Sequence, residues 1–490
     1  MTDTMRTTAT PAAQSERRWP HLLFVLVIWA AIYLSGLGAL EIKGEEGRRI
    51  LPAVTMLQSG NFLVPQVGSD PYFSKPPLIN WLVAAAFTIT GRQNEWSARL
   101  PSALAVLAVA LAFMTVARRT LGSSGSFVAA LVWMTNFGMV EKGRLIELEA
   151  LYISLTALAF IGWVSWWQEG RSPWLTWTVP WIFLGLSLLA KGPVNLVFFY
   201  PVVVAVLWRG GGLRLLLHPA HFVGVLIMLS IFSAWAIPCL VIMNEGAVAH
   251  TWTRQFSGRL TGEDFKFSGW IMNIPRGIAY FLPWSLLFFL RPRPTFGDRS
   301  AAAVASGIMW GAGLSFLVIS LLPGSLPRYT MPVLGPVIWL VALLLTAEPS
   351  QLPRFMRLRA PLWIRPELRL PVVIAILTGI AVMLYGFGLI PFLKKREKVR
   401  GIAAEINAVL PAREPLYAVD PDYQPFLFYV REPIVYLSRP EKVPTNAHFV
   451  LVQPANEELL KSSTGGQAHV ILRVKDYRKK EVAIFALEGR

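Results

Sequence analysis

The chain has little cysteine, histidine or charge. Its 490 residues include one cysteine and six histidines, and 15% of the residues are charged. The single cysteine, Cys239, excludes an intrachain disulfide and lies in an apolar run, where we expect it to serve packing. A soluble domain has about 25% charged residues. The low charge, together with 54% hydrophobic residues, therefore indicates a polytopic membrane protein.

The chain also lacks the glycine motifs that bind nucleotides, since neither a P-loop nor a dinucleotide fingerprint is present. Acidic residues are scarce, with 29 Asp and Glu against 46 Lys and Arg. No long basic run interleaved with aromatic residues occurs, so we attribute the excess to cytoplasmic loops that face anionic headgroups. Nucleic acid is therefore not an expected partner.

Long hydrophobic runs dominate the chain instead. A spanning helix needs about 20 apolar residues. The predicted spans are 20–40, 98–117, 122–141, 149–168, 173–190, 193–208, 219–242, 277–291, 301–321, 329–346 and 370–392. The first span is longer than the core of a signal peptide, which is roughly 7–15 residues. We expect it to stay uncleaved, behind a disordered cytoplasmic N-terminus formed by residues 1–19.

The apolar segment 77–91 is short, and counting it as a span would move Arg118 and Arg119 to the outside. We therefore expect a helix in the membrane interface, with a re-entrant hairpin as the alternative. The predicted bundle has about 11–13 spans. Its first outer loop, 41–97, is too long for a plain connection and is predicted to hold two juxtamembrane helices.

Residues 393–490 differ in composition from the membrane domain, 20–392. Charge rises and long apolar runs end. An amphipathic helix is expected at KKREKVRGIAAEINAVL, and a second helix at EELLKSS. Short β-rich runs occur at PLYAVD, EPIVYLS, HFVLVQP, AHVILRV and EVAIFALE. The fold class predicted is an all-α membrane bundle followed by a small α/β domain, which the topology places outside the cytoplasm.

Charged residues from distant parts of the chain fall on the same non-cytoplasmic face. Glu45 and Glu46 follow the first span, and Glu149 begins a later one. A carboxylate that is partly buried at the membrane boundary can act as a general base. The structural alternative is a solvated acid that caps the following helix.

Basic residues on that face could bind an anion. Lys75 precedes a proline pair that fixes the backbone, and Lys191 lies in the tight turn AKGP. Arg328 can bind phosphate through two hydrogen bonds, and the hydroxyl of Tyr329 can add a donor. A snorkelling residue at the interface is the structural alternative. Because these residues converge on one face, they predict a site for chemistry on an anionic substrate.

Tyr72, in YFSKPP, and Arg144, in GRLIELE, complete the candidate residues. No metal site is predicted, because His250 is the only histidine in the outer loops of the membrane domain and no second ligand stands at i+3 or i+4. Glu263 and Asp264 are expected to form a solvated turn.

Several segments, taken in order, resemble a known family over about residues 20–345. They are GEEGRRILPAVTMLQSGNFLVPQVGSDPYFSKPPLINWL, EWSARLPSAL, GRLIELEALYISLTALAF, LLAKGP, WAIP, RQFSGR, FLPWS and LPRYTMP. The resemblance is to membrane glycosyltransferases of the GT-C class, especially the lipid A aminoarabinose transferases and the dolichyl-phosphate-mannose protein mannosyltransferases. It implies eleven or more spans, two juxtamembrane helices and an outer C-terminal domain.

The resemblance also implies roles for individual residues. The family transfers a sugar from a polyprenyl phosphate on the periplasmic or lumenal face, and its acidic pair falls on Glu45 and Glu46. Other family site positions fall on Arg48, Lys75, Glu149, Lys191, Arg259 and Tyr329. Two Asp positions of the family carry Glu here, and the extra methylene can shift a base by about 1 Å.

Two further departures from the family concern a metal. The family's Glu before the phosphate-binding lysine is Ser74 here, and a loop His aligns with Lys266. In aminoarabinose transferases these two positions are associated with a metal. Since both are lost together, neither a metal nor another cofactor is predicted, and we expect Lys266 to supply the missing positive charge.

These observations predict an inverting glycosyltransferase of the bacterial inner membrane, with a polyprenyl-phosphate sugar donor and a hydroxyl-bearing lipid, glycan or protein acceptor. Glu45 would take the acceptor proton, and Glu149 would orient the acceptor or a basic residue. Lys75, Lys191 and an arginine would hold the phosphate. The alternatives are a transporter or flippase of a lipid-linked sugar, for which matching interrupted spans are missing, and a degenerate member that only binds a partner.

Overall fold

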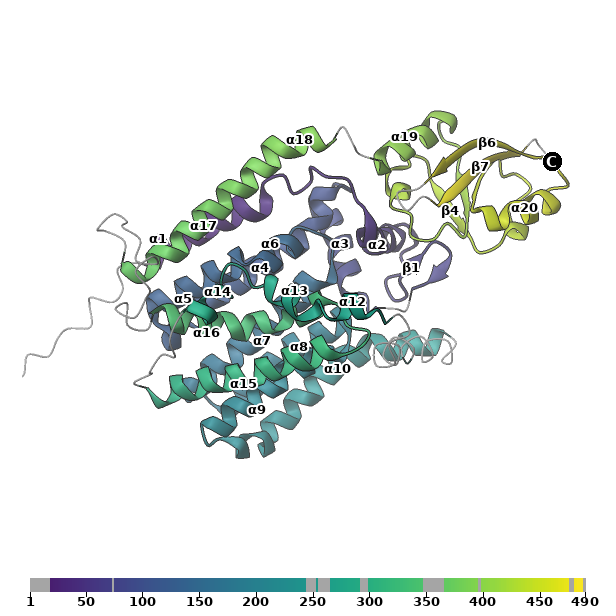
Figure 1. The fold of residues 1–490 in the computed structure, drawn as a ribbon. Coiled ribbons are helices and arrows are strands. Elements are labelled where there is room, and N and C mark those ends of the chain that lie inside the picture. The colour runs from purple at the N-terminus through teal and green to yellow at the C-terminus, as the bar shows by residue number, and fades with distance from the viewer. Residues whose placement is uncertain are drawn as a thin grey trace, which may run out of the picture.

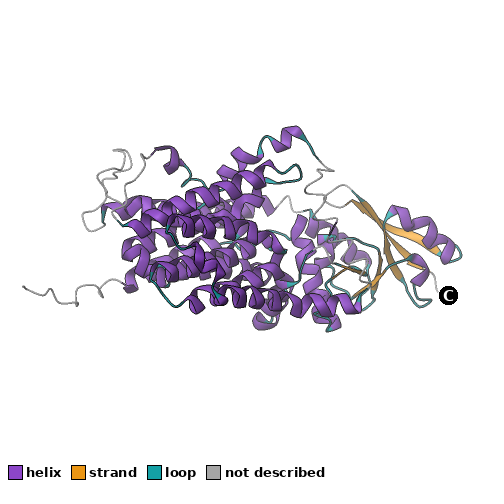
Figure 2. Ribbon diagram, turned by 90° about the horizontal axis from the view of Figure 1, so that it is seen from below, coloured by secondary structure: helices purple, strands orange, loops and turns teal. Residues whose placement is uncertain are grey.

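The computed structural model describes residues 18–72, 75–243, 253, 265–290, 298–346, 365–394, 398–475 and 480–487. A bundle of helices forms most of the molecule, and a small α/β domain lies at one end of it, beyond α2 (Gly47–Ser59) (Figure 1). Figure 2 shows the strands gathered at that end.

The membrane domain is built mainly from helices. Within the described part of the chain, seven helical segments are long and apolar enough to cross a membrane, and three shorter apolar helices accompany them. The helices are α1 (Arg18–Trp29), α4 (Glu95–Thr115), α5 (Arg118–Thr135), α6 (Phe137–Lys142), α7 (Leu148–Gln168), α8 (Pro173–Lys191), α9 (Leu196–Arg209), α10 (Pro219–Ile242), α12 (Phe267–Trp270), α13 (Asn273–Ala279), α14 (Leu286–Leu290), α15 (Arg299–Leu321), α16 (Leu334–Thr346), α17 (Pro366–Leu384) and α18 (Ile390–Leu393). The predicted polytopic helical bundle is thus confirmed.

Three predicted spans differ from the helices observed. The segment 20–40 is helical only as far as Leu34, because Ser35 is extended. The segment 277–291 is not one helix, because α13 ends at Ala279 and α14 begins only at Leu286. Pro283 lies between them and has no amide hydrogen to continue a helical ladder. The segment 122–141 runs past the end of α5, since Asn136 is extended and its side chain caps α6.

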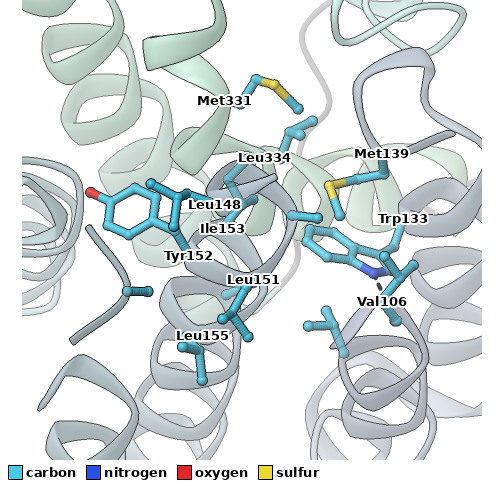
Figure 3. Close-up of a cluster of buried hydrophobic side chains, with 14 of the residues drawn as sticks. Val106, Trp133, Met139, Leu148, Leu151, Tyr152, Ile153, Leu155, Met331 and Leu334 are labelled. Atoms are coloured by element: carbon cyan, nitrogen blue, oxygen red, sulfur yellow. Dashed lines mark hydrogen bonds between the residues drawn. The ribbon is translucent and has the colours of Figure 1, made fainter. Parts of the chain in front are cut away.

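Helix α7 lies at the centre of the bundle. Its sequence is apolar on all sides, which is typical of a helix surrounded by others, and it packs against α4, α8 and α16. Figure 3 shows its side chains beside Trp133, whose indole N–H donates to the Val106 carbonyl over 3.0 Å. The buried indole N–H of Trp133 is thus satisfied within the protein, as an apolar surrounding favours.

The first outer loop holds two helices, α2 and α3 (Leu78–Thr90), with a short hairpin of β1 (Gln66–Val67) and β2 (Asp70–Pro71) between them. Helix α3 is continuous and ends at Gly91, whose φ of 64° is left-handed. The alternative prediction, a re-entrant hairpin at 77–91, is therefore wrong. The interfacial position of these helices stays a prediction.

The C-terminal domain has a mixed five-stranded sheet in the order β4-β3-β5-β7-β6. Strands β3, β4 and β5 are parallel, and β7 pairs antiparallel with both β5 and β6. The elements are α19 (Val399–Val409), β3 (Leu416–Val419), β4 (Ile434–Leu437), β5 (Phe449–Val452), α20 (Glu457–Ser463), β6 (Ala468–Lys475) and β7 (Glu481–Leu487). All five predicted strands and both helices are confirmed.

Candidate active site

The segment 41–49, which we call the Glu45 segment, leaves the first span through a 3₁₀ turn, Gly44–Glu46, and enters α2. Glu46 is buried, and its carboxylate accepts from Nε and Nη2 of Arg99 over 2.8 Å each. The amide of Ile146 also donates to it, over 3.0 Å. Glu46 was predicted beside Glu45 as a catalytic acid, but the structure gives its carboxylate three donors within the protein.

Arg99 fixes the same segment from the side of α4. Beyond its ion pair with Glu46, it donates to the carbonyls of Leu37 and Leu40 over 2.9 Å each and to that of Glu41 over 3.2 Å. An arginine fork is well suited to several acceptors of fixed geometry. The chain that follows the first span is therefore tied to the start of α4.

Glu45 lies on the accessible side of the segment. Its side chain is 43% exposed and forms an ion pair with Nη1 of Arg48 over 3.4 Å. The guanidinium of Arg48 lies 3.8 Å from the centroid of the Tyr423 ring, which belongs to the C-terminal domain. Of the two neighbouring carboxylates, Glu45 is the one that an incoming group could reach.

A second cluster forms where α7, α8 and the 3₁₀ segment Pro327–Val333 meet. Glu149 Oε1 lies 3.3 Å from Lys191 Nζ and 3.2 Å from Arg328 Nε. Lys191 Nζ also lies 4.8 Å from the Tyr329 ring centroid and 5.2 Å from that of Tyr152. Predicted site residues from three distant parts of the chain thus meet in one place.

The Glu45 segment borders this cluster. Glu46 accepts from the amide of Ile146, only three residues before Glu149. Figure 3 shows Tyr152 at the edge of the buried apolar side chains, with its hydroxyl directed away from them. The arrangement combines an accessible carboxylate with cations held by a buried one.

A third group of charged residues, which was not predicted from the sequence, is centred on Lys142. Its ammonium is buried and lies 3.0 Å from the carboxylates of both Glu141 and Glu147. Burial acts to lower the pKa of Lys142, but the two carboxylates outweigh it and raise the pKa above its usual value. Burial, aided by the charge of Glu149, raises the pKa of Glu147 despite the nearby ammonium. In the sequence, this group is indicated only by the two closely spaced glutamates of GRLIELE, the segment that directly follows Lys142.

Two predicted residues make structural contacts. Arg144 donates to the carbonyls of Ile32 and Ser35, the latter over 2.6 Å, at the end of the first helix. Helix ends leave carbonyls without intrahelical partners, and Arg144 satisfies two of them. Tyr72 accepts from Nη1 of Arg49 over 2.9 Å, which ties the loop before Lys75 to α2.

The remaining candidate residues either border segments that the structure does not describe or lie within them. Lys75 is half-buried just before α3, and Lys266 is exposed just before α12. Arg259, Ser74, His250, Glu263 and Asp264 lie outside the described residues. Across the ranges that the structure describes, no group of three or more His, Cys, Asp or Glu residues could hold a metal.

Comparison with known proteins adds to this geometry. A family model described as dolichyl-phosphate-mannose-protein mannosyltransferase matches residues 74–237. The crystal structure of ArnT from Cupriavidus metallidurans bound to undecaprenyl phosphate superposes with a TM-score of 0.71, covering 96% of this chain and 98% of that one at 20% identity. The chain is similar to the GT-C membrane glycosyltransferases. The structural match shows a shared fold, and it extends over the C-terminal domain.

Curated GT-C relatives match part of the chain. Undecaprenyl phosphate-alpha-4-amino-4-deoxy-L-arabinose arabinosyl transferase 2 of Pseudomonas fluorescens is 26% identical over 333 residues, 66% of this chain and 58% of that protein. The corresponding transferase of Pseudomonas savastanoi pv. phaseolicola is 27% identical over 331 residues, 64% of this chain and 60% of that protein. The matched region of this chain thus spans about three-fifths of each relative's length.

Proposed function

We propose that this protein is a membrane glycosyltransferase. It moves a sugar from a polyprenyl-phosphate donor to a hydroxyl of a lipid, glycan or protein acceptor on the extracytoplasmic face of the inner membrane. The observation that carries the proposal is a pair of neighbouring groups, the accessible Glu45 carboxylate and the cations around Glu149, which the hydrogen bond from the Ile146 amide to Glu46 connects. The names of the relatives support the class of donor.

The reaction needs a base on one side of the sugar and positive charge on the other. The acceptor hydroxyl attacks the anomeric carbon while the bond from that carbon to the phosphate oxygen breaks. The acceptor proton passes to Glu45, and the polyprenyl phosphate leaves with the bonding electrons. Attack opposite the leaving phosphate inverts the anomeric centre.

The cations stabilise the negative charge that develops on the leaving phosphate. Lys191 and Arg328 are the central pair, and Tyr329 lies beside both of them. Glu149 holds this pair in place, because one of its oxygens contacts both cations. Lys75, Arg259 and Lys266 are proposed as further contacts to the donor.

The remaining predicted residues, together with Arg99, are proposed to position the base. Glu46 and Arg99 fix the turn that carries Glu45. Arg48 holds the Glu45 carboxylate directly. Tyr72 and Arg144 fix the surrounding backbone through Arg49 and the end of the first helix.

The first test replaces Glu45 by Gln. Purified protein in lipid nanodiscs is incubated with membrane lipid extract and radiolabelled polyprenyl-phosphate sugars, and products are separated by thin-layer chromatography. We expect wild type to move label to a new product, and Glu45→Gln to bind donor normally while losing turnover by about 100-fold or more, as expected for a lost general base.

The matched control is Glu405→Gln, which makes the same change at an exposed position on α19. It should transfer label like wild type. A fully active Glu45→Gln would overturn the assignment of the base. If wild-type protein binds labelled donor but never transfers it, the proposed transferase is wrong, and passage of the lipid-linked sugar becomes the better explanation.

A further inference from the structure

The C-terminal domain holds both ends of the Glu45 segment. At the first end, the Glu41 carboxylate accepts from the amides of Lys398, Val399 and Arg400 over 3.3, 2.9 and 3.1 Å. The hydroxyl of Tyr429 accepts from the Ile42 amide over 2.6 Å. These contacts attach the exit of the first span to the start of α19.

The acid of α4 strengthens this attachment. Tyr429 donates to Glu95 Oε1 over 2.8 Å, and Arg400 forms an ion pair with the same carboxylate. Glu41 and Glu95 are both buried. Burying a carboxylate without hydrogen-bond or ion-pair partners costs free energy. The C-terminal domain supplies these partners to Glu41 and Glu95, which favours its observed position against the bundle.

At the second end, the domain touches the residues that flank Glu45. Gly47 packs so closely that a Cβ there would lie 3.1 Å from the Tyr423 carbonyl oxygen. The buried Tyr423 ring lies under the Arg48 guanidinium, 3.8 Å from centroid to Cζ. Arg48 in turn forms the ion pair with Glu45. A continuous set of contacts thus runs from the C-terminal domain to the proposed base.

We propose that Tyr423 is a positioning residue for Glu45 and acts through Arg48, so that the C-terminal domain forms part of the acceptor side of the site. This inference rests on the proposed function. The Tyr423 ring holds the guanidinium flat by cation–π attraction, and the guanidinium limits where the half-exposed Glu45 carboxylate can lie. Without the ring, Arg48 and Glu45 sample other rotamers, and the acceptor hydroxyl meets the base less often.

The positioning of Arg48 depends on the aromatic ring of Tyr423 and not on its phenolic hydroxyl. Tyr423→Phe keeps the ring, whereas Tyr423→Leu keeps an apolar side chain and removes the ring. Misplacing a reacting group by about 1 Å can cost roughly 100-fold in rate. We therefore expect Tyr423→Leu to lower kcat by about 10- to 100-fold with donor KM within about twofold of wild type, and Tyr423→Phe to stay within about threefold of wild type.

The test uses the full-length protein in nanodiscs with a polyprenyl-phosphate sugar as donor. Arg48→Gln, at a half-exposed position, should show the same loss of kcat, and adding Tyr423→Leu to it should cost little more. Tyr417→Leu is the control, since Tyr417 packs in a separate cluster formed only by C-terminal residues. It should leave kcat unchanged.

Each result decides for or against the proposal. The proposal is overturned if Tyr423→Leu has the same kcat as wild type. It is also overturned if Tyr423→Phe and Tyr423→Leu lose kcat equally, or if Tyr423→Leu raises donor KM and leaves kcat unchanged. If Tyr423→Leu fails to fold, Arg48→Gln with normal kcat still refutes the route through Arg48. Absence of transfer in wild type would instead refute the proposed function, which keeps the two failures distinct.

Discussion

Glu45 and Glu46 are adjacent in sequence but lie in different surroundings. The 3₁₀ turn directs Glu46 into the protein toward Arg99 and leaves Glu45 at the surface beside Arg48. A buried carboxylate that has lost its only cation is strongly disfavoured. The pair therefore separates into one residue that fixes the backbone and one whose carboxylate is available.

This division predicts a stability effect at Arg99. Arg99→Met would leave Glu46 buried without its cation, and we expect a loss of about 3–5 kcal/mol in the free energy of unfolding. Thermal unfolding in detergent measures it. Arg92→Met, at an exposed position, should change the value by less than about 0.5 kcal/mol. Equal melting temperatures for the two variants would contradict the role of the ion pair.

Residue-scale features were the hardest to predict. The sequence places Glu45, Glu149, Lys191 and Tyr329 on one face, because the spans themselves are easily counted. It cannot show that Arg144 turns back to the first helix, or that Lys142 is buried between two acids. Those contacts involve partners that are distant in the sequence. Which side chains meet depends on how each helix is rotated about its axis, and only the packing of the bundle determines that.

Helices and strands were predicted far better. Runs of about 20 apolar residues define the spans regardless of their partners, and the alternation of short β-rich runs with turns gave the five strands. The span at 277–291 failed because its composition is apolar while Pro283 interrupts the backbone. Composition alone does not separate one long helix from two short ones.

An element-scale prediction concerns α19, whose first turn is capped by a carboxylate from another part of the molecule. Glu41→Ala removes the acceptor of three backbone amides. Loss of an N-terminal cap costs about 0.5–2 kcal/mol, so amides of Val399–Val409 should exchange with solvent several-fold faster. Hydrogen exchange followed by mass spectrometry measures this. Glu405→Ala, within α19, should leave the rates unchanged or lower them, and unaltered exchange in Glu41→Ala would refute the cap.

At the scale of the whole molecule, the proposed base Glu45 lies where the bundle meets the C-terminal domain. We predict that both face the outside of the membrane. In a Cys239→Ala background, Glu405→Cys should react with a membrane-impermeant maleimide in intact cells. Arg209→Cys, at the end of α9, should react only after permeabilisation. The reverse pattern would invert the topology and move the proposed site to the cytoplasm.

The contact between Tyr423 and Arg48 also has a consequence for biosynthesis. A chain is made and inserted from its N-terminus, so the first span and the Glu45 segment are in place long before residues 398–487 have been translated. Until those residues have been exported and folded, Glu41 lacks the amides of α19 and Arg48 lacks the Tyr423 ring. A nascent chain would therefore hold the proposed base in a loosely defined position until the C-terminal domain has folded against it.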